Sequence, residues 1–188
     1  MNILLSFFIT AVVLVVVIIG IILALVFVRR NRAKRFQNKF GSDEYDRAVE
    51  TLGGAKKAQT ELDGRQDHVD GLDIRSLTDV ERARYQADWK NVQAKFVDQP
   101  GQADIDADRL IMEVMQLRDY PVSDFDQRAA DISINYPDLV SNYRAAREIA
   151  NKNKEHKADT EELRQAMIYY RSLFEELLKP EAVAVLEN

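Results

Sequence analysis

The sequence predicts an all-α protein with an N-terminal transmembrane helix, a helical stalk and a compact soluble helical bundle. A long uncharged apolar run opens the chain, and apolar residues beyond position 40 recur at spacings of three and four. Only 7 glycines and 4 prolines occur in 188 residues, which leaves few residues for the turns that join strands. We therefore expect four segments: a transmembrane helix (1–28), a basic collar with a helical stalk (29–71), a helical bundle (72–179) and a flexible tail (180–188).

The apolar run covers residues 3–28 and is interrupted only by Ser6, Thr10 and Gly20. At about 1.5 Å per residue such a helix reaches roughly 39 Å, more than the roughly 30 Å hydrocarbon core of a bilayer. A cleaved signal peptide would need a basic segment before a shorter apolar core and a small-residue cleavage site after it. The run has neither, so we expect an uncleaved membrane span.

Six basic residues and no acidic ones follow the run directly: Arg29, Arg30, Arg32, Lys34, Arg35 and Lys39. Basic residues beside a span tend to stay in the cytoplasm, and only two residues precede the run. We therefore expect a single-pass protein of the cell membrane with its N-terminus outside and its C-terminal domain in the cytoplasm; a domain facing outward is the alternative. These six residues either act as a topology signal only or are also the candidate lipid-contacting residues, since basic side chains near a bilayer attract anionic lipids.

The rest of the chain is acidic. The protein has 26 basic and 31 acidic residues, and the apolar run with the collar holds six basic and no acidic ones, so 20 basic residues oppose 31 acidic ones, a net charge of −11. An acidic domain matches the phosphates of nucleic acid poorly, and we expect no nucleic-acid partner. The chain has no cysteine, which excludes disulfides, thiolate catalysis and cysteine-bound metals.

In the stalk, Ser42 or Asp43 is expected to cap a helix with apolar positions over residues 45–52. The glycine pair 53–54 then interrupts the helix, because each glycine costs about 1 kcal/mol relative to alanine in a helix interior. A weakly amphipathic helical stretch is expected over residues 55–69.

The bundle is expected to begin after a connector at residues 72–77, where Thr78 and Glu81 can form a capping box. The helix that follows carries apolar residues spaced four, three and four apart: Tyr85, Trp89, Val92 and Phe96. This stripe predicts a core-facing side, with an aromatic ligand site as the alternative. A second helix after Pro100 is expected to bury apolar residues over 107–117.

The second half of the bundle is expected to hold three helices. The Ser-Asp pair at 123–124 opens a short helix, and Pro137 suits the first turn of the next one. Polar residues 151–157 are expected to form a loop, after which the Asp-Thr pair at 159–160 caps the last helix. The apolar face of that helix consists of Leu163, Ala166, Met167, Tyr170, Leu173, Phe174 and Leu177.

No familiar catalytic or nucleotide-binding signature occurs: the chain lacks GxxxxGK[ST], GxGxxG after a strand, HExxH and GxSxG. His68 and His156 have no partner four residues on and are expected to be ordinary solvated residues. We therefore expect no catalytic, cofactor-binding or metal-ligating residue, no cofactor and no enzymatic activity.

Asp104, Asp106 and Asp108 imitate the opening of a calcium loop. Such a loop also needs glycine at its sixth position and glutamate at its twelfth, where this chain has Arg109 and Met115. Acidic residues are favoured near a helix N-terminus by its partial positive charge, and we expect these three to serve that role.

The last two helices carry a candidate protein interface of aromatic and basic residues: Tyr136, Tyr143, Arg144, Arg147, Tyr169 and Arg171. Tyrosine and arginine are typical interface anchors, and these would form one exposed patch if the helices lie side by side. The alternative is that the tyrosines are half buried in the core and the arginines are solvated.

Four stretches resemble a widespread bacterial family of small proteins with an N-terminal hydrophobic segment: FGSDEYDRAVE (40–50), LDIRSLTDVERARYQADWKNVQAKFVDQP (72–100), ADRLIMEVMQLRDYPVSDFDQRAADIS (107–133) and TEELRQAMIYYRSLFEELL (160–178). Its members are usually labelled hypothetical, membrane or secreted proteins, and the resemblance implies no activity. Where the family has YRAAH and a histidine-tyrosine pair in its last helix, this chain has Arg147 and Tyr169. The resemblance therefore transfers no histidine-based site.

The sequence thus predicts a non-enzymatic membrane protein whose acidic helical domain binds an unknown protein partner. One alternative is a membrane-tethered enzyme or small-ligand binder that uses a groove between helices, and another is an outward-facing structural protein of the envelope. A buried cluster of unpaired charged groups would favour the enzyme or ligand binder, whereas a plain apolar core would not.

Overall fold

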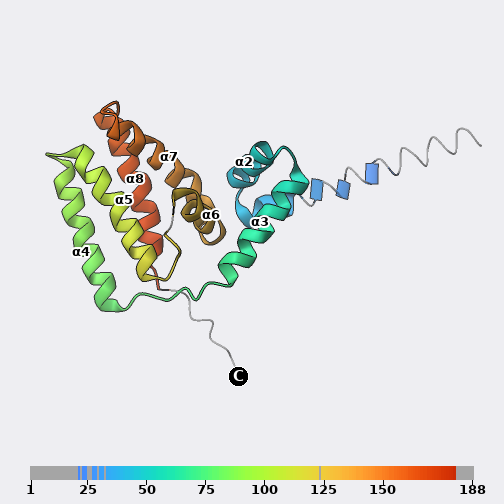
Figure 1. Ribbon diagram of the computed structural model, residues 1–188, viewed down its shortest axis with the longest axis horizontal. Helices are drawn as coiled ribbons and strands as arrows, with labels where there is room; N and C mark the ends of the chain where they lie inside the picture. Colours follow the sequence, from blue (N-terminus) through green and yellow to red (C-terminus); the bar gives the residue numbers. More distant parts are fainter. Residues whose placement is uncertain are drawn as a thin grey trace, which may run out of the picture.

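The computed structural model describes residues 21, 23–24, 27–28, 30–31, 33–122 and 124–180 (Figure 1). All regular secondary structure in these ranges is helical, which confirms the all-α prediction for the described part of the chain. The labelled helices are α2 (Ser42–Leu52), α3 (Ala55–Asp70), α4 (Asp79–Phe96), α5 (Pro100–Leu117), α6 (Phe125–Asn135), α7 (Pro137–Lys154) and α8 (Thr160–Leu177).

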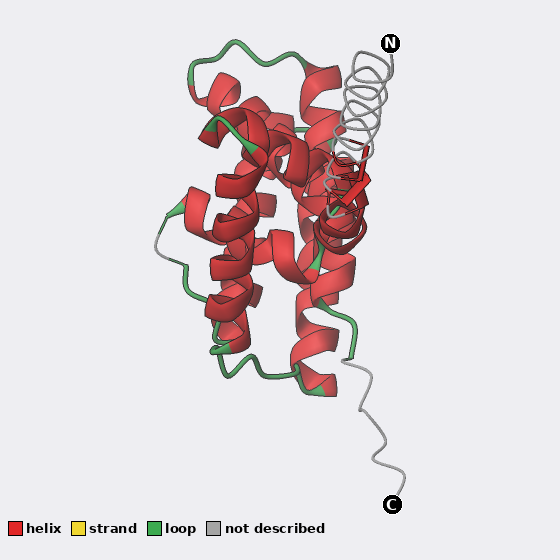
Figure 2. Cartoon of the chain, turned by 90° about the vertical axis from the view of Figure 1, so that its right-hand side faces the viewer, coloured by secondary structure: helices red, strands yellow, loops and turns green. Residues whose placement is uncertain are grey.

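The helices form a bundle with a clear order of neighbours. Helix α4 packs against α5, α5 against α8, α8 against α7, and α7 against α6. The α2–α3 pair packs against α6 and α7, at the edge of the bundle opposite α4 (Figure 1). In the described ranges the chain is drawn as helices joined by loops (Figure 2). The helix at residues 33–40, which contains the second half of the basic collar, lies at the α2–α3 edge and far from α4 (Figure 1).

Local sequence signals fix most of the helix starts. Thr78 and Glu81 form the predicted capping box of α4, and Asp159 with Glu162 forms a second one at α8. Asp124 accepts a hydrogen bond from the Gln127 backbone N–H (2.9 Å) and caps α6. Helices α5 and α7 both begin with proline, which lacks an N–H that would otherwise go unbonded.

The core of the bundle is built from the predicted apolar faces. Tyr85, Trp89 and Val92 of α4 are buried, and Phe96 is partly buried against the same cluster. The seven apolar residues predicted for the last helix are all buried as well. The prediction that these stripes face the core is confirmed, and burial of such side chains is the main stabilising term of the fold.

Two local predictions are wrong. Neither Ser42 nor Asp43 caps α2: the cap position is Gly41, with φ of 78° and no side-chain hydrogen bond. Residues 151–157 do not all form a loop, because α7 continues to Lys154. Its last turn is held by contacts outside the helix, since the Lys152 ammonium pairs with Glu162 (2.6 Å) and the Asn153 amide donates to the Gly101 carbonyl (2.8 Å).

The segment expected to be a stalk instead packs against the bundle. Helices α2 and α3 form a second small core with α6, made by Phe40, Tyr45, Ala48, Ala58, Leu62, Val69 and Ile134. Gly41 lies so close to α7 that a Cβ atom there would come within 3.2 Å of the Pro137 carbonyl oxygen. Each helix has few apolar residues, and only the pairing of the two with Ile134 completes a core.

The predicted membrane span lies almost entirely outside the described residues, which include only positions 21, 23, 24, 27 and 28 of it. Within the described ranges, no helix combines the length and the apolar character needed to cross a bilayer.

Candidate functional site

A groove runs between α4 and α8 and is the candidate site for a partner. Its wider part has a volume of about 400 Å³, and a second hollow continues it toward the end of α4, with Gln93 common to both. The groove is lined by Arg82, Gln86, Trp89, Lys90, Gln93 and Phe96 on one side and by Arg164, Met167, Ile168, Arg171, Phe174, Glu175 and Leu178 to Pro180 on the other. We call this the α4/α8 groove.

The two walls of the groove run antiparallel. Arg82, near the start of α4, donates from Nε to the Leu178 carbonyl (2.8 Å), just beyond the end of α8. At the other end, Phe96 closes α4 beside Arg164 in the first turns of α8. Since α4 and α8 both pack strongly on α5, the groove lies on the side of this pair away from α5.

Aromatic side chains form the floor of the groove. The rings of Trp89 and Phe174 stack with centroids 4.7 Å apart. The indole Nε1 of Trp89 is buried and has no hydrogen-bond acceptor in the described part of the chain. A donor without an acceptor is unusual in a protein interior, and it marks the floor as a place where the polar contacts are incomplete.

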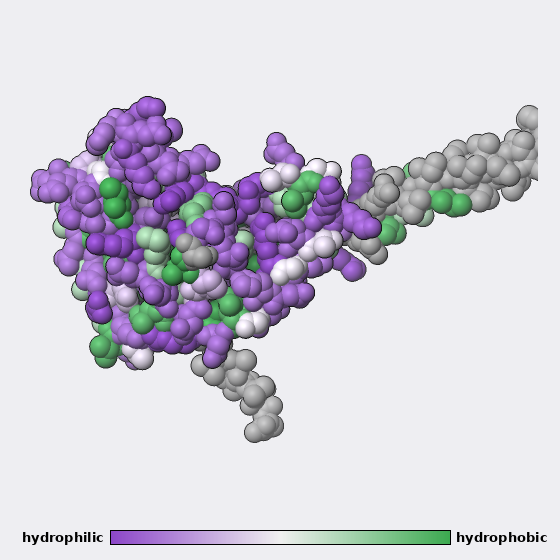
Figure 3. Space-filling model, viewed as in Figure 1, coloured by the Kyte–Doolittle hydropathy of each residue, from purple (hydrophilic) through white to green (hydrophobic). Residues whose placement is uncertain are grey.

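Apart from such grooves, the described surface on the face drawn in Figure 3 is mostly polar. Figure 3 shows a face that is largely hydrophilic, on which hydrophobic residues form small separate patches. A hollow between α4 and α5 illustrates the contrast, since its charged side chains are Asp88, Lys95, Asp106, Arg109 and Glu113. The α4/α8 groove differs from it because apolar side chains line most of its floor.

A buried polar cluster lies where α5, α7 and α8 meet. Asp104 has no exposed surface, and neither of its carboxylate oxygens has a hydrogen-bond partner among the described residues. Burial, together with the nearby charge of Asp108, raises the pKa of Asp104 to about 7, and Asn153 offsets this only in part. Burial therefore favours the protonated form of Asp104 well above the pH at which an ordinary aspartate is charged.

The polar side chains near Asp104 also lack some of their hydrogen-bond partners in the described part of the chain. Asp108 pairs through one oxygen with Arg147 (3.1 Å), while its other oxygen has no hydrogen bond within the described chain. The hydroxyl of Tyr170 is also buried without a partner there, and burial and the two aspartates raise its pKa. This is a buried cluster of incompletely paired groups, the feature expected of a ligand-binding or catalytic interior rather than of a plain apolar core.

The three aspartates of the calcium-like stretch separate in space. Asp106 binds Lys95 (2.5 Å) and Arg109 (3.1 Å), whereas Asp108 binds Arg147 and Asp104 faces the interior. Among the described residues, no group of three or more histidines and carboxylates is arranged to hold a metal ion.

The predicted protein interface does not form one exposed patch. Tyr143 is fully buried and its hydroxyl accepts from Arg128 Nε (3.3 Å), so its expected exposure is wrong. Tyr136 is partly buried and accepts from Arg118 (2.9 Å). Tyr169 is half buried, and of the six residues only Arg171 lines the α4/α8 groove.

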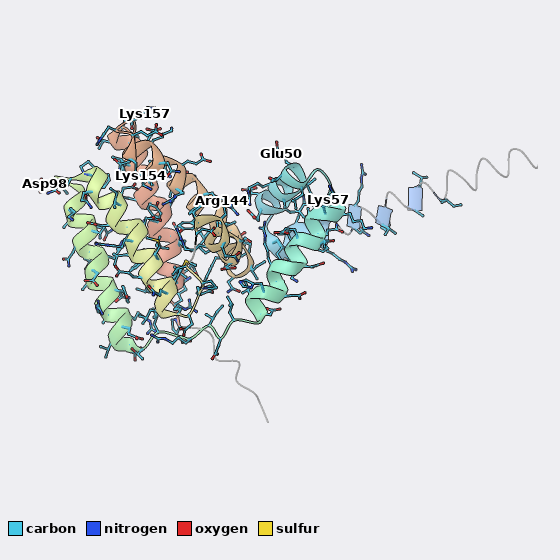
Figure 4. The ribbon with its side chains drawn as sticks, in the orientation of Figure 1. Glu50, Lys57, Asp98, Arg144, Lys154 and Lys157 are labelled. Carbon is cyan, nitrogen blue, oxygen red and sulfur yellow. The ribbon has the colours of Figure 1, made fainter. Side chains whose placement is uncertain are left out.

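Arg144 forms an ion pair within the protein and is not part of an exposed interface. It lies on α7 where this helix faces α2 (Figure 4) and pairs with Glu44 at 3.1 Å. Glu44 is buried and also binds Arg47 (3.2 Å) and Arg65 (2.7 Å). Burial alone would raise the pKa of Glu44, but the hydrogen bond from Arg47 and the charge of Arg144 outweigh it and lower the pKa. This cluster joins α2, α3 and α7.

The predicted lipid-contacting residues are described only in part. Arg29 and Arg32 lie outside the described residues. Arg30, Lys34, Arg35 and Lys39 are exposed, on the helical segments that precede Gly41.

Sequence reasoning missed the buried carboxylates, although helical phase contains the signal. Asp104 stands three residues before Ala107 and seven before Ile111, so it lies on the same buried face. Glu44 similarly stands four residues before the buried Ala48. A charged residue in phase with an apolar stripe is a candidate for burial.

Comparison with known proteins adds no family to this description. No protein-family model, no curated protein and no solved structure matches the chain.

Proposed function

We propose that the protein is a non-enzymatic, single-pass membrane protein whose helical domain binds a protein partner through the α4/α8 groove. The supporting observation is the groove itself, a hollow of about 400 Å³ between two helices whose floor is formed by the stacked and largely buried rings of Trp89 and Phe174. Grooves of this kind, with an apolar floor between two helices, commonly receive a helix of a partner.

The position of the groove in the fold is compatible with a domain that is attached to a membrane through its N-terminus. The helix at residues 33–40 lies at the α2–α3 edge, and α4 lies at the opposite edge (Figure 1). A domain held at a membrane through residues 1–28 would therefore present the groove away from its attachment point. The span would raise the local concentration of the domain at the bilayer without taking part in recognition.

Site-specific cross-linking tests this function. Because the chain has no cysteine, the Gln93→Cys variant carries one thiol in the groove, and Lys57→Cys carries one on exposed α3 as a matched control. A thiol-attached photo-cross-linker in membrane vesicles should give a discrete protein adduct from the groove variant only. Equal adduct patterns from both variants, or none from either, would contradict a partner site in the groove.

The orientation is part of the proposal, with the domain in the cytoplasm. It is supported by the six basic residues after the span and the absence of any before it. A cysteine introduced at Asn188 should resist a membrane-impermeant thiol reagent in intact cells. Labelling without permeabilisation would instead support the outward-facing envelope protein.

A second function, a small-ligand binder or enzyme, is favoured by one observation. Asp104, Asp108 and Tyr170 bury oxygens that have no partner within the described residues. Such a cluster can hold a small polar ligand or transfer a proton. A screen of small polar metabolites by thermal shift should give stabilisation that Asp104→Asn abolishes; if no compound stabilises the protein, this second function fails.

A further inference from the structure

The charges around the α4/α8 groove are opposite in sign to those of the domain that carries it. Beyond the collar, the chain has a net charge of −11. The groove, in contrast, is lined by five basic residues and one acidic residue: Arg82, Lys90, Arg164, Arg171 and Lys179 against Glu175. A local basic rim on an acidic domain indicates selection of an acidic partner at this place.

Four of these cations are available to a partner. Lys90 has no ion pair with any described residue. Arg164 and Arg171 pair with Glu161 and with Glu175 (3.7 Å), and Lys179 pairs with Glu176; the three cationic side chains are at least half exposed. Exposed pairs of this kind are weak, so a partner's carboxylates can replace them at little cost.

Arg82 is the exception because each of its three guanidinium nitrogens already donates to an acceptor within the protein. It pairs with Asp79 (2.7 Å) and donates to the Leu178 and Leu77 carbonyls (2.8 and 3.2 Å). We therefore assign Arg82 to closing one end of the groove rather than to contacting a partner.

The shape of the groove fits a helix. From Arg82 to Phe96 the α4 wall is about 21 Å long at 1.5 Å per residue, or about four helical turns. Antiparallel walls with apolar side chains such as Trp89 and Ile168 between them can accept the apolar stripe of a third helix. The basic residues stand on both walls, with Lys90 on α4 and the arginines on α8.

We propose that the occupant of the groove is an amphipathic helix of a partner protein, about four turns long, whose apolar stripe is flanked on both sides by Glu or Asp. The inference rests on the proposed function and specifies the partner. An acidic helix is favoured because the charged side chains that line this groove are mostly basic, whereas the hollow between α4 and α5 has charges of both signs.

Synthetic peptides provide the probe. Three 18-residue amphipathic helices share one leucine stripe and differ only in the flanking residues, which are Glu, Gln or Lys. The full chain is kept in detergent micelles, and its single tryptophan, Trp89, reports binding by fluorescence. The Glu peptide should bind about tenfold more tightly than the Gln peptide, and more tightly still than the Lys peptide. Salt should weaken binding of the Glu peptide most.

A charge-reversal pair tests whether the rim causes this preference. The double variant Lys90→Glu and Arg171→Glu should reverse the order of the Glu and Lys peptides. The matched control, Lys56→Glu and Lys57→Glu, makes the same charge change on exposed α3 and should leave the order unchanged.

Each other outcome overturns the inference in a different way. Equal binding of all three peptides would remove the acidic preference but retain the groove as a partner site, so it would not affect the proposed function. If no peptide binds although cross-linking at position 93 succeeds, the partner is not a helix. Binding only after removal of residues 181–188 would assign the groove to this chain itself. Self-association that the double variant abolishes would assign it to a second copy.

Discussion

Two buried carboxylates, one in each half of the protein, have opposite surroundings. Glu44 in the α2–α3 half is 2% exposed and contacts three guanidinium groups. Asp104 in the α5–α7–α8 half has no exposed surface, and its oxygens have no partner within the described chain. The pKa of Glu44 is lowered, and that of Asp104 is raised to about 7.

Burial alone does not determine the charge of a carboxyl group. Desolvation disfavours the charged form of both carboxylates, but only Glu44 has partners that compensate for it. Glu44 therefore acts as a charged link between helices, while Asp104 is a titratable group in the core. Asp131 lies between the two cases, because it accepts from Gln127 (2.8 Å) but leaves one oxygen without a bond in the described residues.

The largest expected effect is that Asp104→Asn stabilises the protein. Its pKa rises from 3.8 in the unfolded chain to about 7 in the folded one, so the native state binds more protons between these values. Stability therefore falls as the pH rises through this window, by about 4 kcal/mol at pH 8. Asparagine has no charge to lose, and urea unfolding should show a gain of about 4 kcal/mol at pH 8 and about 1–2 kcal/mol at pH 5.

Asp106→Asn is the matched control two residues along the same helix. Burial would raise the pKa of Asp106, but the hydrogen bonds from Lys95 and Gln102 and the charges of Lys95 and Arg109 together outweigh burial and lower the pKa. Its contribution is therefore present at neutral pH and lost as the pH falls below its pKa. The control should destabilise the protein by about 1 kcal/mol at pH 7. If Asp104→Asn and Asp106→Asn change the free energy of unfolding in the same direction, the proposed difference between an unpaired and a paired buried carboxylate is wrong.

Glu44→Ala should destabilise the protein by about 3 kcal/mol, because it leaves three arginines around an empty position. The loss should be concentrated in α2 and α3, where hydrogen exchange should accelerate more than in α4. Equal acceleration of hydrogen exchange in α2–α3 and in α4 would indicate that Glu44 does not stabilise the α2–α3 half in particular.

Arg144→Ala and Arg171→Ala separate a structural arginine from a surface one. Removal of Arg144 deprives buried Glu44 of one partner and should cost about 2 kcal/mol. Arg171 has a half-exposed side chain and a distant partner, so its removal should cost less than about 0.5 kcal/mol. Chemical denaturation measures both, and equal losses would place Arg144 on the surface as the sequence led us to expect.

The smallest expected effect concerns His68, whose Nε2 lies 3.6 Å from Asp131. The histidine side chain is 45% exposed, and Asp131 keeps its hydrogen bond from Gln127. His68→Ala should therefore change the free energy of unfolding at pH 7 by less than about 0.5 kcal/mol. A loss above 1 kcal/mol would mean that Asp131 depends on this histidine.

Most of the fold could be predicted, because its signals are local. The capping box at Thr78, the aspartate cap at Asp159 and the proline at position 137 each act within one helical turn. The candidate site could not be predicted to the same degree. Trp89 was expected to be buried, but the groove also needs Phe174, which stands 85 residues further along the chain.

The sequence by itself determined the helical class, most helix boundaries and the apolar faces, since these depend on residues within a few positions of one another. Only the tertiary structure decided which charged residues are buried and which are paired. Arg144 meets Glu44 across 100 residues, and Asp104 lies among groups that do not satisfy it. These outcomes depend on how helices pack, and a charged side chain carries no local sign of the partner it will meet.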